Sequence, residues 1–199
     1  MAHSVSPEAY AIVEVATGKV VDSRNADSVA LPGSTVKPFL PKTPALFPCG
    51  RTLRIGEHRL DCTHPVVYGP IGEADALVLS CNCYYAALAL RLAPAEVKRA
   101  LGEFDAQLAS TPEQRQLQAL GYWGVSATPL RLARAYRRLL LSGPPPGFIG
   151  KTGTTKDAAW YAGWAPGENP RFVAAVMTGG RGITDAEPAA RKLFAKWLH

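Results

Sequence analysis

Long apolar runs are missing from this sequence: none approaches the roughly 18 consecutive residues of a membrane-spanning helix, so no transmembrane segment is expected. The N-terminal residues MAHSVSPEAY contain no charged segment followed by an apolar stretch, so no signal peptide is visible. The sequence also lacks internal repeats and low-complexity segments. With 199 residues, 47% of them hydrophobic, we expect a single compact domain over residues 1–199.

Clusters of basic residues are nearly absent, although the net charge is +6. Such a charge would suit an anionic polymer, a membrane surface or nucleic acid. However, no basic run is interleaved with aromatic residues, as a nucleic-acid platform would require. The one cluster lies on a predicted helix and is interpreted as a solvated face (Arg131, Arg134, Arg137 and Arg138). We therefore expect no nucleic-acid partner.

Cysteine is also scarce, with Cys49, Cys62, Cys81 and Cys83 too few for a disulfide scaffold. Cys49 and Cys62 flank CGRTLRIGEHRLDC, a predicted short β-ribbon, and a disulfide across it is expected only in an oxidising compartment. These cysteines and His64 are also the ligands of an alternative reading, a zinc-stabilised binding module. Their spacing, especially C-x-C within a predicted helix, fits no common tetrahedral pattern, so we expect no metal or other cofactor.

Hydrophobic periodicity predicts strands at both ends of the chain and helices between them. Residues 10–15 and 19–24 form a predicted hairpin around Thr17-Gly18, and residues 74–92 a mostly buried helix. Further helices are predicted near 94–104, 111–120, 129–143 and 186–198, and three strands in FIGKTGTT, AAWYAGWA and RFVAAVMTGG. The predicted fold class is α/β. An antiparallel sheet from residues 10–24 and 147–180 packs against a helical block of about 34–143.

The first motif whose side chains could act in catalysis is Ser34-Thr35-Val36-Lys37, an S-x-x-K pattern. Residues three apart share one face of a helix, so the lysine amine can reach the serine hydroxyl. A lysine whose pKa is lowered by burial or by a neighbouring cation can accept the serine proton and activate the nucleophile. Pro41 and Pro44 must end this helix early.

The second motif is Ser80-Cys81-Asn82, inside the predicted helix of residues 74–92. Two polar residues two apart do not share a helix face, but at a helix start or a kink both could point into a cleft. Ser80 could then relay a proton and Asn82 could bind a substrate amide. The alternative is a pair of satisfied polar residues in a buried helix.

The third motif is Lys151-Thr152-Gly153-Thr154, on the first of the C-terminal strands. Gly153 would let a substrate backbone approach the strand. Lys151 and Thr152 offer a cation and a hydroxyl to a carboxylate. The alternative is an exposed strand with a surface lysine. The glycine and the Trp160–Trp164 run that follows argue against this alternative.

The order S-x-x-K, S-x-N, K-T-G resembles the signature of penicillin-binding proteins and class A β-lactamases. PGSTVKPF resembles the start of the active-site helix of a penicillin-binding transpeptidase, and SCNCYYAALA and VSATPLRLARAYRRLLLSG resemble two further stretches of that family. GKTGTT and AWYAGWAP resemble its K-T-G-T strand and the aromatic strand that follows. The chain is short for this family, which usually carries longer inserts and a pedestal or membrane anchor.

The resemblance implies acyl transfer on D-Ala-D-Ala stem peptides of peptidoglycan, with acylation by penicillin, at the outer face of the cell envelope. Ser34 would be the nucleophile, Lys37 its base, and Ser80 and Lys151 would return the proton to the leaving group. Asn82, Thr152, Gly153 and Thr154 would bind substrate, and the backbone N–H groups of Ser34 and Thr154 would form the oxyanion hole.

Three other activities stay open. A β-lactamase of the same fold needs a base for the deacylating water, and the candidates Glu103 and Glu113 have no motif around them. A β-lactam sensor would be acylated without turnover. A Ser–His dyad using His58 or His64 lacks a residue that orients the imidazole, so a surface or structural role is expected for both.

Overall fold

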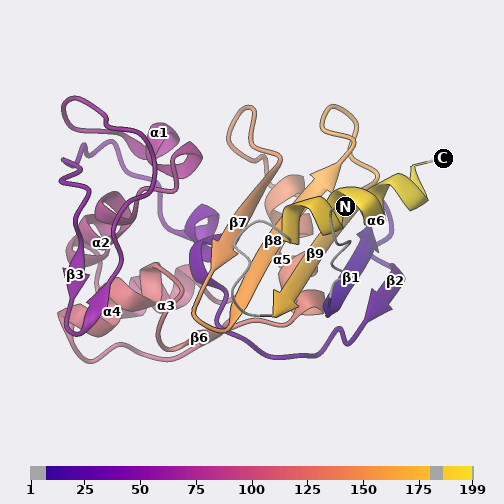
Figure 1. The fold of residues 1–199 in the computed structure, drawn as a ribbon, viewed down its shortest axis with the longest axis horizontal. Coiled ribbons are helices and arrows are strands. Elements are labelled where there is room, and N and C mark those ends of the chain that lie inside the picture. The colour runs from indigo at the N-terminus through magenta and orange to yellow at the C-terminus, as the bar shows by residue number, and fades with distance from the viewer. Residues whose placement is uncertain (1–7, 180–185, 199) are drawn as a thin grey trace, which may run out of the picture. The chain divides into compact units, whose positions relative to one another are not determined.

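The computed structural model describes residues 8–179 and 186–198 (Figure 1). The chain divides into two compact units: unit 1 comprises Met1–Thr35 and Ser126–His199, and unit 2 comprises Val36–Val125. The single domain expected from the sequence stays a prediction. Within the described ranges, none of the helices combines the length and the apolar character needed to cross a membrane.

Unit 1 is built on a five-stranded antiparallel sheet with the strand order β2-β1-β9-β8-β7 (Figure 1). The strands are β1 (Ala9–Glu14), β2 (Val20–Arg24), β7 (Gly150–Thr154), β8 (Ala158–Ala165) and β9 (Phe172–Gly179). The predicted N-terminal hairpin is confirmed, because Tyr10 pairs with Arg24 and Ile12 with Asp22. The pairing of β1 with β9 joins the two ends of the chain in one sheet, as predicted.

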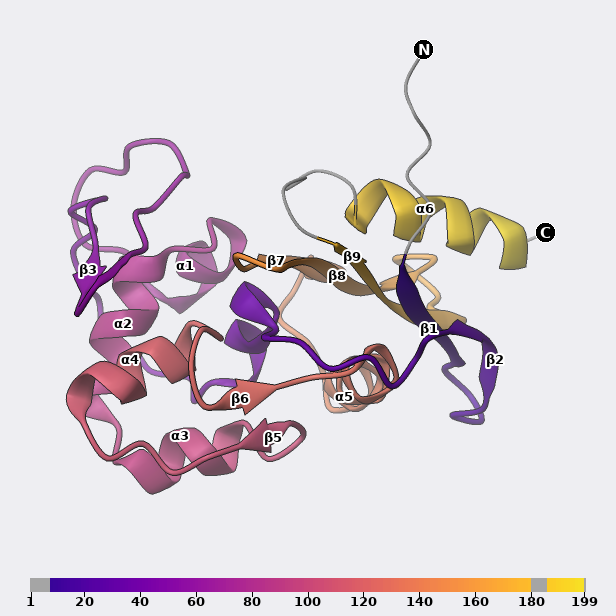
Figure 2. The same cartoon turned by 60° about the horizontal axis from the view of Figure 1, so that its bottom comes forward.

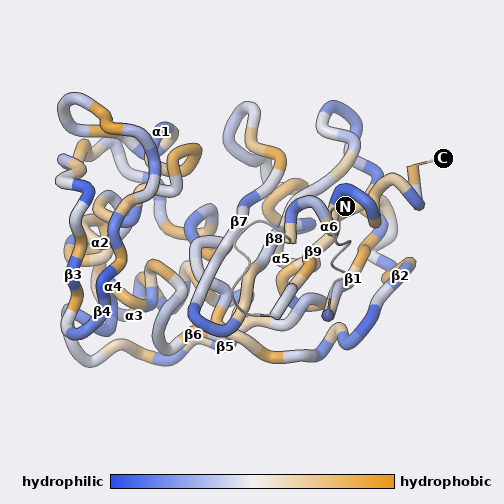
Figure 3. The backbone as a smooth tube through the Cα atoms, in the orientation of Figure 1, coloured by the Kyte–Doolittle hydropathy of each residue, from blue (hydrophilic) through white to orange (hydrophobic). Residues whose placement is uncertain are grey.

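One helix covers each face of this sheet (Figure 2). α6 (Ala186–Trp197) packs on one face, where Phe194 joins Tyr161 and Val176 in an apolar cluster. α5 (Pro129–Leu141) contacts β1, β8 and β9 on the other. Because both faces are covered, nearly every residue of β8 and β9 is buried. Figure 3 shows the contrast with the hydrophilic turn that joins β7 to β8.

The sequence of α5 explains where this helix begins and which face it buries. The hydroxyl of Thr128 accepts a hydrogen bond from the Arg131 amide, and Pro129 occupies the first turn, where a missing N–H costs nothing. Leu132 and Tyr136 lie on its buried face. α5 was expected in the helical block of residues 34–143. Its apolar stripe instead packs on the sheet, so it belongs to unit 1.

Unit 2 contains short helices and a long irregular segment. Its elements are β3 (Arg54–Ile55), β4 (His58–Arg59), α1 (Glu73–Val78), α2 (Asn82–Arg91), α3 (Pro94–Ala100), β5 (Asp105–Ala106) and α4 (Pro112–Ala119), followed by β6 (Val125–Ser126). The pairing of Arg54 with Arg59 confirms the predicted ribbon. Residues 40–72 otherwise contain no helix or strand.

The single helix predicted over residues 74–92 is wrong, because the structure breaks it between α1 and α2. The break is a Schellman motif, in which the Cys81 amide donates to the Ala76 carbonyl and the Ser80 amide to the Leu77 carbonyl. Ser80 adopts φ +53°, a left-handed conformation that this motif usually assigns to glycine. The periodic apolar pattern continues across the break, so periodicity alone did not reveal it.

Candidate functional site

Ser34 and Lys37 lie on one short helix, η1 (Gly33–Phe39), a 3₁₀ helix that contains Pro38. The side chains of residues three apart eclipse each other in this type of helix. The S-x-x-K spacing therefore places Ser34 and Lys37 on the same side of η1. Thr35 ends the first segment of unit 1 and Val36 begins unit 2, so Ser34 belongs to unit 1 and Lys37 to unit 2.

In unit 1, the chain that leads into Ser34 is held by side chains of β8 and α5. The indole Nε1 of Trp160 donates to the Leu31 carbonyl at 3.0 Å. The hydroxyl of Tyr136 donates to the Thr35 carbonyl at 2.9 Å. Both aromatic side chains are fully buried, and the hydrogen bond of Tyr136 is shielded from water. They fix the backbone on each side of Ser34, which itself is half-buried.

The same segment packs directly on β7. A Cβ atom at Gly153 would lie 2.4 Å from the Pro32 carbonyl oxygen and 3.0 Å from the Thr35 amide nitrogen. A Cβ at Gly33, whose φ is +54°, would lie 2.9 Å from the Thr154 amide nitrogen. The predicted reason for Gly153 was close approach of a substrate backbone. The structure adds another reason, because the chain's own Ser34 segment occupies the space that a Cβ at Gly153 would need.

Lys151 lies on the same face of β7 as Gly153, because the two residues pair with Ala162 and Trp160 on one side of the sheet. Only 7% of its surface is exposed, and burial lowers the pKa of its ammonium to about 8. Nζ donates to the Thr152 carbonyl at 3.2 Å. A buried lysine with this pKa can exchange its proton near neutral pH.

The two threonines of the third motif are placed differently. Thr152 pairs with Tyr161 and Thr154 with Ala159, so both side chains project from the other face of the sheet. Their predicted role beside Lys151 would require a ligand that reaches around the edge strand. The backbone amide of Thr154, in contrast, belongs to a segment in direct contact with the Ser34 segment.

In unit 2, the ammonium of Lys37 is buried and surrounded by oxygen atoms of the second motif. Nζ donates to the Ser80 carbonyl at 2.8 Å, to the Ser80 hydroxyl at 3.3 Å and to Oδ1 of Asn82 at 2.6 Å. It also lies 5.3 Å from the ring centroid of Tyr85, within cation–π range. The structure therefore joins Lys37, Ser80 and Asn82 in one polar network.

The junction between α1 and α2 explains how two residues that are two apart reach one lysine. Ser80 ends α1 in its left-handed conformation, and Asn82 begins α2. Between them, the Cys81 thiol caps α2 by accepting a hydrogen bond from the Tyr84 amide at 3.4 Å. Nδ2 of Asn82 donates to the Leu60 carbonyl at 3.0 Å, which fixes the orientation of its amide. The structure therefore shows the helix break at this motif, and both polar side chains meet Lys37 there.

The fold has clear counterparts among solved structures. The structure of Pseudomonas aeruginosa PBP2 in complex with WCK 5153 matches with a TM-score of 0.75 at 18% identity, covering 97% of this chain and 74% of that one. The penicillin-binding protein PBP2 from Helicobacter pylori matches with a TM-score of 0.71 at 14% identity, covering 88% of this chain and 57% of that one. The chain has the fold of these penicillin-binding proteins. No protein-family model and no curated protein matches its sequence.

Within this penicillin-binding protein fold, sequence reasoning missed the residues that hold the serine segment. Tyr136 and Trp160 carry a polar atom on an otherwise apolar side chain and sit in buried runs, so the sequence marks them only as core. The distances from their polar atoms to Thr35 and Leu31 identify them as positioning residues.

The candidate base Glu113 is exposed, and its carboxylate lies 3.7 Å from where a Gly56 Cβ would be, beside the β3–β4 turn.

The cysteine and histidine side chains lie closer together than their spacing in the sequence indicated. Cys49, Cys62 and Cys81 are free thiols. Together with His64 they offer ligand atoms that all lie within 4.8 Å of one another, although their spacing seemed unsuited to a metal site. His64 is oriented after all: Nδ1 lies 2.8 Å from the Pro65 carbonyl and Nε2 lies 3.5 Å from the Cys49 sulfur.

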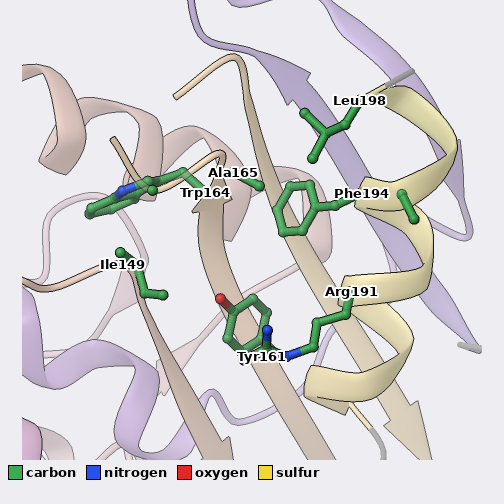
Figure 4. A pocket seen from close by; sticks show the side chains of 9 residues that line it. Ile149, Tyr161, Trp164, Ala165, Arg191, Phe194 and Leu198 are labelled. Carbon is green, nitrogen blue, oxygen red and sulfur yellow. The ribbon is translucent and has the colours of Figure 1, made fainter. Parts of the chain in front are cut away.

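A pocket of about 320 Å³ elsewhere in unit 1 is separate from the predicted residues. It lies between β8 and α6 and is mainly apolar (Figure 4). Tyr161, Trp164 and Phe194 form part of its wall, and Arg191 at its rim pairs with Glu187 at 2.7 Å. Lining residues from α6 place this pocket on the sheet face opposite Lys151. None of the eight residues predicted to act in catalysis or binding lines this pocket.

Proposed function

We propose that this protein is a penicillin-sensitive serine acyl-transferase that acts on D-Ala-D-Ala stem peptides of peptidoglycan. The observation that carries the proposal is the hydrogen-bond network of Lys37 with Ser80 and Asn82. These residues belong to two motifs far apart in the sequence, and the network supports a joint role for them in catalysis. Ser34 lies on the same side of η1 as Lys37 and would be the nucleophile.

The proposed reaction begins from the neutral amine of Lys37, which accepts the hydroxyl proton of Ser34 as the serine oxygen attacks the carbonyl of the penultimate D-alanine. The tetrahedral oxyanion would be stabilised by the backbone amides of Ser34 and Thr154, which belong to two segments in direct contact. Ser80, hydrogen-bonded to Lys37, would pass the proton on, and the D-alanine amine would leave with it. The acyl group then passes from Ser34 to an acceptor amine or to water, and the serine hydroxyl is restored.

Lys151 would hold the terminal carboxylate of the stem peptide or of a β-lactam, because its buried ammonium lies on the face of β7 that contacts the Ser34 segment. Thr152 and Thr154, which project from the other face of this edge strand, would add hydroxyls to a ligand that reaches around the edge. β7 is an edge strand of the sheet, so a peptide could align along it and form main-chain hydrogen bonds. Such substrates lie outside the cytoplasmic membrane, and we propose an envelope location.

Mass spectrometry of the intact protein after incubation with penicillin tests the proposal. We expect one covalent equivalent, mapped to Ser34, and no adduct in Ser34→Ala. Ser23→Ala is the matched control, because Ser23 is exposed on β2 and should leave acylation unchanged. An adduct that persists in Ser34→Ala, or no adduct on the folded wild-type protein, would refute the assignment of the nucleophile.

A further inference from the structure

Unit 2 contains four soft metal ligands that converge from three separate segments. Cys49 precedes the β3–β4 ribbon, Cys62 and His64 follow it, and Cys81 caps α2. All of their ligand atoms lie within 4.8 Å of one another, and three of the four residues are buried. The proposed acyl transfer uses none of these side chains.

The distances within the cluster fit a tetrahedral zinc ion. Zinc–sulfur bonds of about 2.3 Å and zinc–nitrogen bonds of about 2.0–2.1 Å place two sulfurs about 3.7 Å apart, and a sulfur and a nitrogen about 3.5 Å apart. The sulfurs of Cys62 and Cys81 are separated by 3.7 Å. The sulfur of Cys49 and Nε2 of His64 are separated by 3.5 Å. The sulfurs of Cys62 and Cys81 are too far apart for a disulfide, whose bond is about 2.05 Å long.

The groups around the cluster are those that a zinc site requires. The carbonyl of Pro65 lies 2.8 Å from Nδ1 of His64, so it accepts the Nδ1 proton and leaves the Nε2 lone pair for a metal. The amide of Tyr84 donates to the Cys81 sulfur at 3.4 Å, and the amide of Cys83 donates to the Cys62 sulfur at 3.5 Å. Such N–H donors stabilise thiolates, the form in which cysteine binds metal.

We propose that Cys49, Cys62, His64 and Cys81 bind one structural zinc ion. Three thiolates and one imidazole suit zinc better than the oxygen-preferring magnesium or calcium. Four protein ligands complete a tetrahedron and leave no open position, so the ion orders the chain and does not take part in chemistry. Binding displaces the remaining thiol protons to solvent.

A structural ion also accounts for the order of residues 40–72, which contain only the two short strands of the ribbon. Segments of this length without secondary structure are uncommon in compact proteins unless something anchors them. Three of the four ligands lie in this segment, and the fourth lies at the start of α2. The ion would therefore tie the segment to α2, in addition to the hydrogen bonds from Asn82 to the Leu60 carbonyl and from the Cys83 amide to the Cys62 sulfur.

Metal analysis of the protein purified under reducing conditions tests the proposal. We expect one zinc per chain, and loss of the zinc in Cys62→Ser and His64→Ala. Cys83→Ser is the matched control: its sulfur lies 3.6 Å from that of Cys62, but it is not one of the four ligands. It should retain the zinc. A wild-type protein that binds no zinc even on titration, or equal loss of zinc in Cys83→Ser and Cys62→Ser, would overturn the proposal.

Measurements on the wild-type chain keep the test valid if a cysteine variant fails to fold. Chelation should lower the melting temperature by more than roughly 10 °C, because metal binding and folding are coupled. Replacement by Co²⁺ should produce thiolate charge-transfer absorption and the intense visible bands of tetrahedral coordination. Octahedral Co²⁺ spectra, or an unchanged melting temperature after removal of a bound metal, would overturn the site. Zinc binding without penicillin acylation would refute only the proposed function.

Discussion

A hydrogen bond of 2.6 Å joins the ammonium of Lys37 to the side-chain oxygen of Asn82, which lies 45 positions further along the chain. It is shorter than the two hydrogen bonds that Lys37 donates to Ser80. Because Nδ2 of Asn82 donates to the Leu60 carbonyl at the same time, the asparagine amide is held at both ends. Asn82 therefore sets the position of the lysine amine.

Replacing Asn82 with alanine should slow acylation by penicillin by about 10- to 100-fold, because a hydrogen bond to a charged group contributes about 1.5–3 kcal/mol. The measurement is the second-order rate constant of acylation with a fluorescent penicillin. Gln114→Ala is a suitable control, because the Gln114 side chain only accepts hydrogen bonds from Ser110 at the start of α4. An unchanged rate in Asn82→Ala would remove this residue from the site.

The variant Lys37→Arg separates charge from basicity. Arginine keeps a cation near Ser80 and Asn82 but does not release its proton at accessible pH. If Lys37 is the base that activates Ser34, acylation should fall by at least about 100-fold, the loss typical of a general base. Circular dichroism should show that the variant is folded. Acylation close to the wild-type rate in a folded Lys37→Arg would assign the base role elsewhere.

Burial of Lys151 should destabilise the folded protein in a pH-dependent way. Its pKa is about 8 in the folded protein against 10.5 for an unperturbed lysine, a difference that corresponds to about 3 kcal/mol. Below about pH 8 the folded protein holds a buried ammonium. Between about pH 8 and 10.5, folded Lys151 is neutral while the unfolded chain still binds the proton, so this contribution to stability rises with pH.

Lys151→Met should therefore be more stable than the wild type at pH 7, by up to about 3 kcal/mol. The gain should shrink as the pH rises toward 10.5. Urea denaturation at several pH values measures it. Lys156→Met is the control, because Lys156 is exposed in the turn after β7 and its replacement should change little. A gain in Lys151→Met that is constant across this pH range would show that burial of charge is not its cause.

Gly153→Ala should disturb the Ser34 segment, because the new Cβ would lie 2.4 Å from the Pro32 carbonyl oxygen. Overpacking of this kind costs about 1–3 kcal/mol of stability. We expect slower acylation together with a lower melting temperature. Gly167→Ala should change neither, because its new Cβ would meet only Ile149 at an ordinary 3.5 Å. Wild-type acylation in Gly153→Ala would show that the contact does not position Ser34.

The penicilloyl adduct on Ser34 should persist for minutes or longer, with slow nitrocefin turnover after a single burst. A β-lactamase needs a base that activates the deacylating water. Of the two candidate glutamates, Glu113 is exposed beside the β3–β4 turn. A D-Ala-D-Ala peptide or a thioester analogue should be cleaved or transferred to an amine. Sustained rapid nitrocefin hydrolysis would favour the β-lactamase alternative, and a stable adduct without any peptide activity would favour a sensor.

Local chemistry made several features predictable from the sequence. The apolar strands near both ends of the chain predicted the sheet, and the helix predicted near 129–143 is present as α5, which begins at Pro129. The order of the three motifs predicted the candidate catalytic and substrate-binding residues. These features depend on residues close together in the chain or on a pattern of residue types, so no knowledge of the packing was needed.

Only the tertiary structure revealed the break at Ser80, because the apolar periodicity of α1 and α2 is continuous and the Schellman motif contains serine where glycine would have signalled an end. The same is true of Gly153, which accommodates the chain's own Pro32 carbonyl. It is true again of the cluster of Cys49, Cys62, His64 and Cys81, since irregular loops bring these ligands together at distances that sequence spacing does not encode. For Gly153 and for the cluster, the deciding contact joins residues whose separation in space is set by packing and not by the local chain.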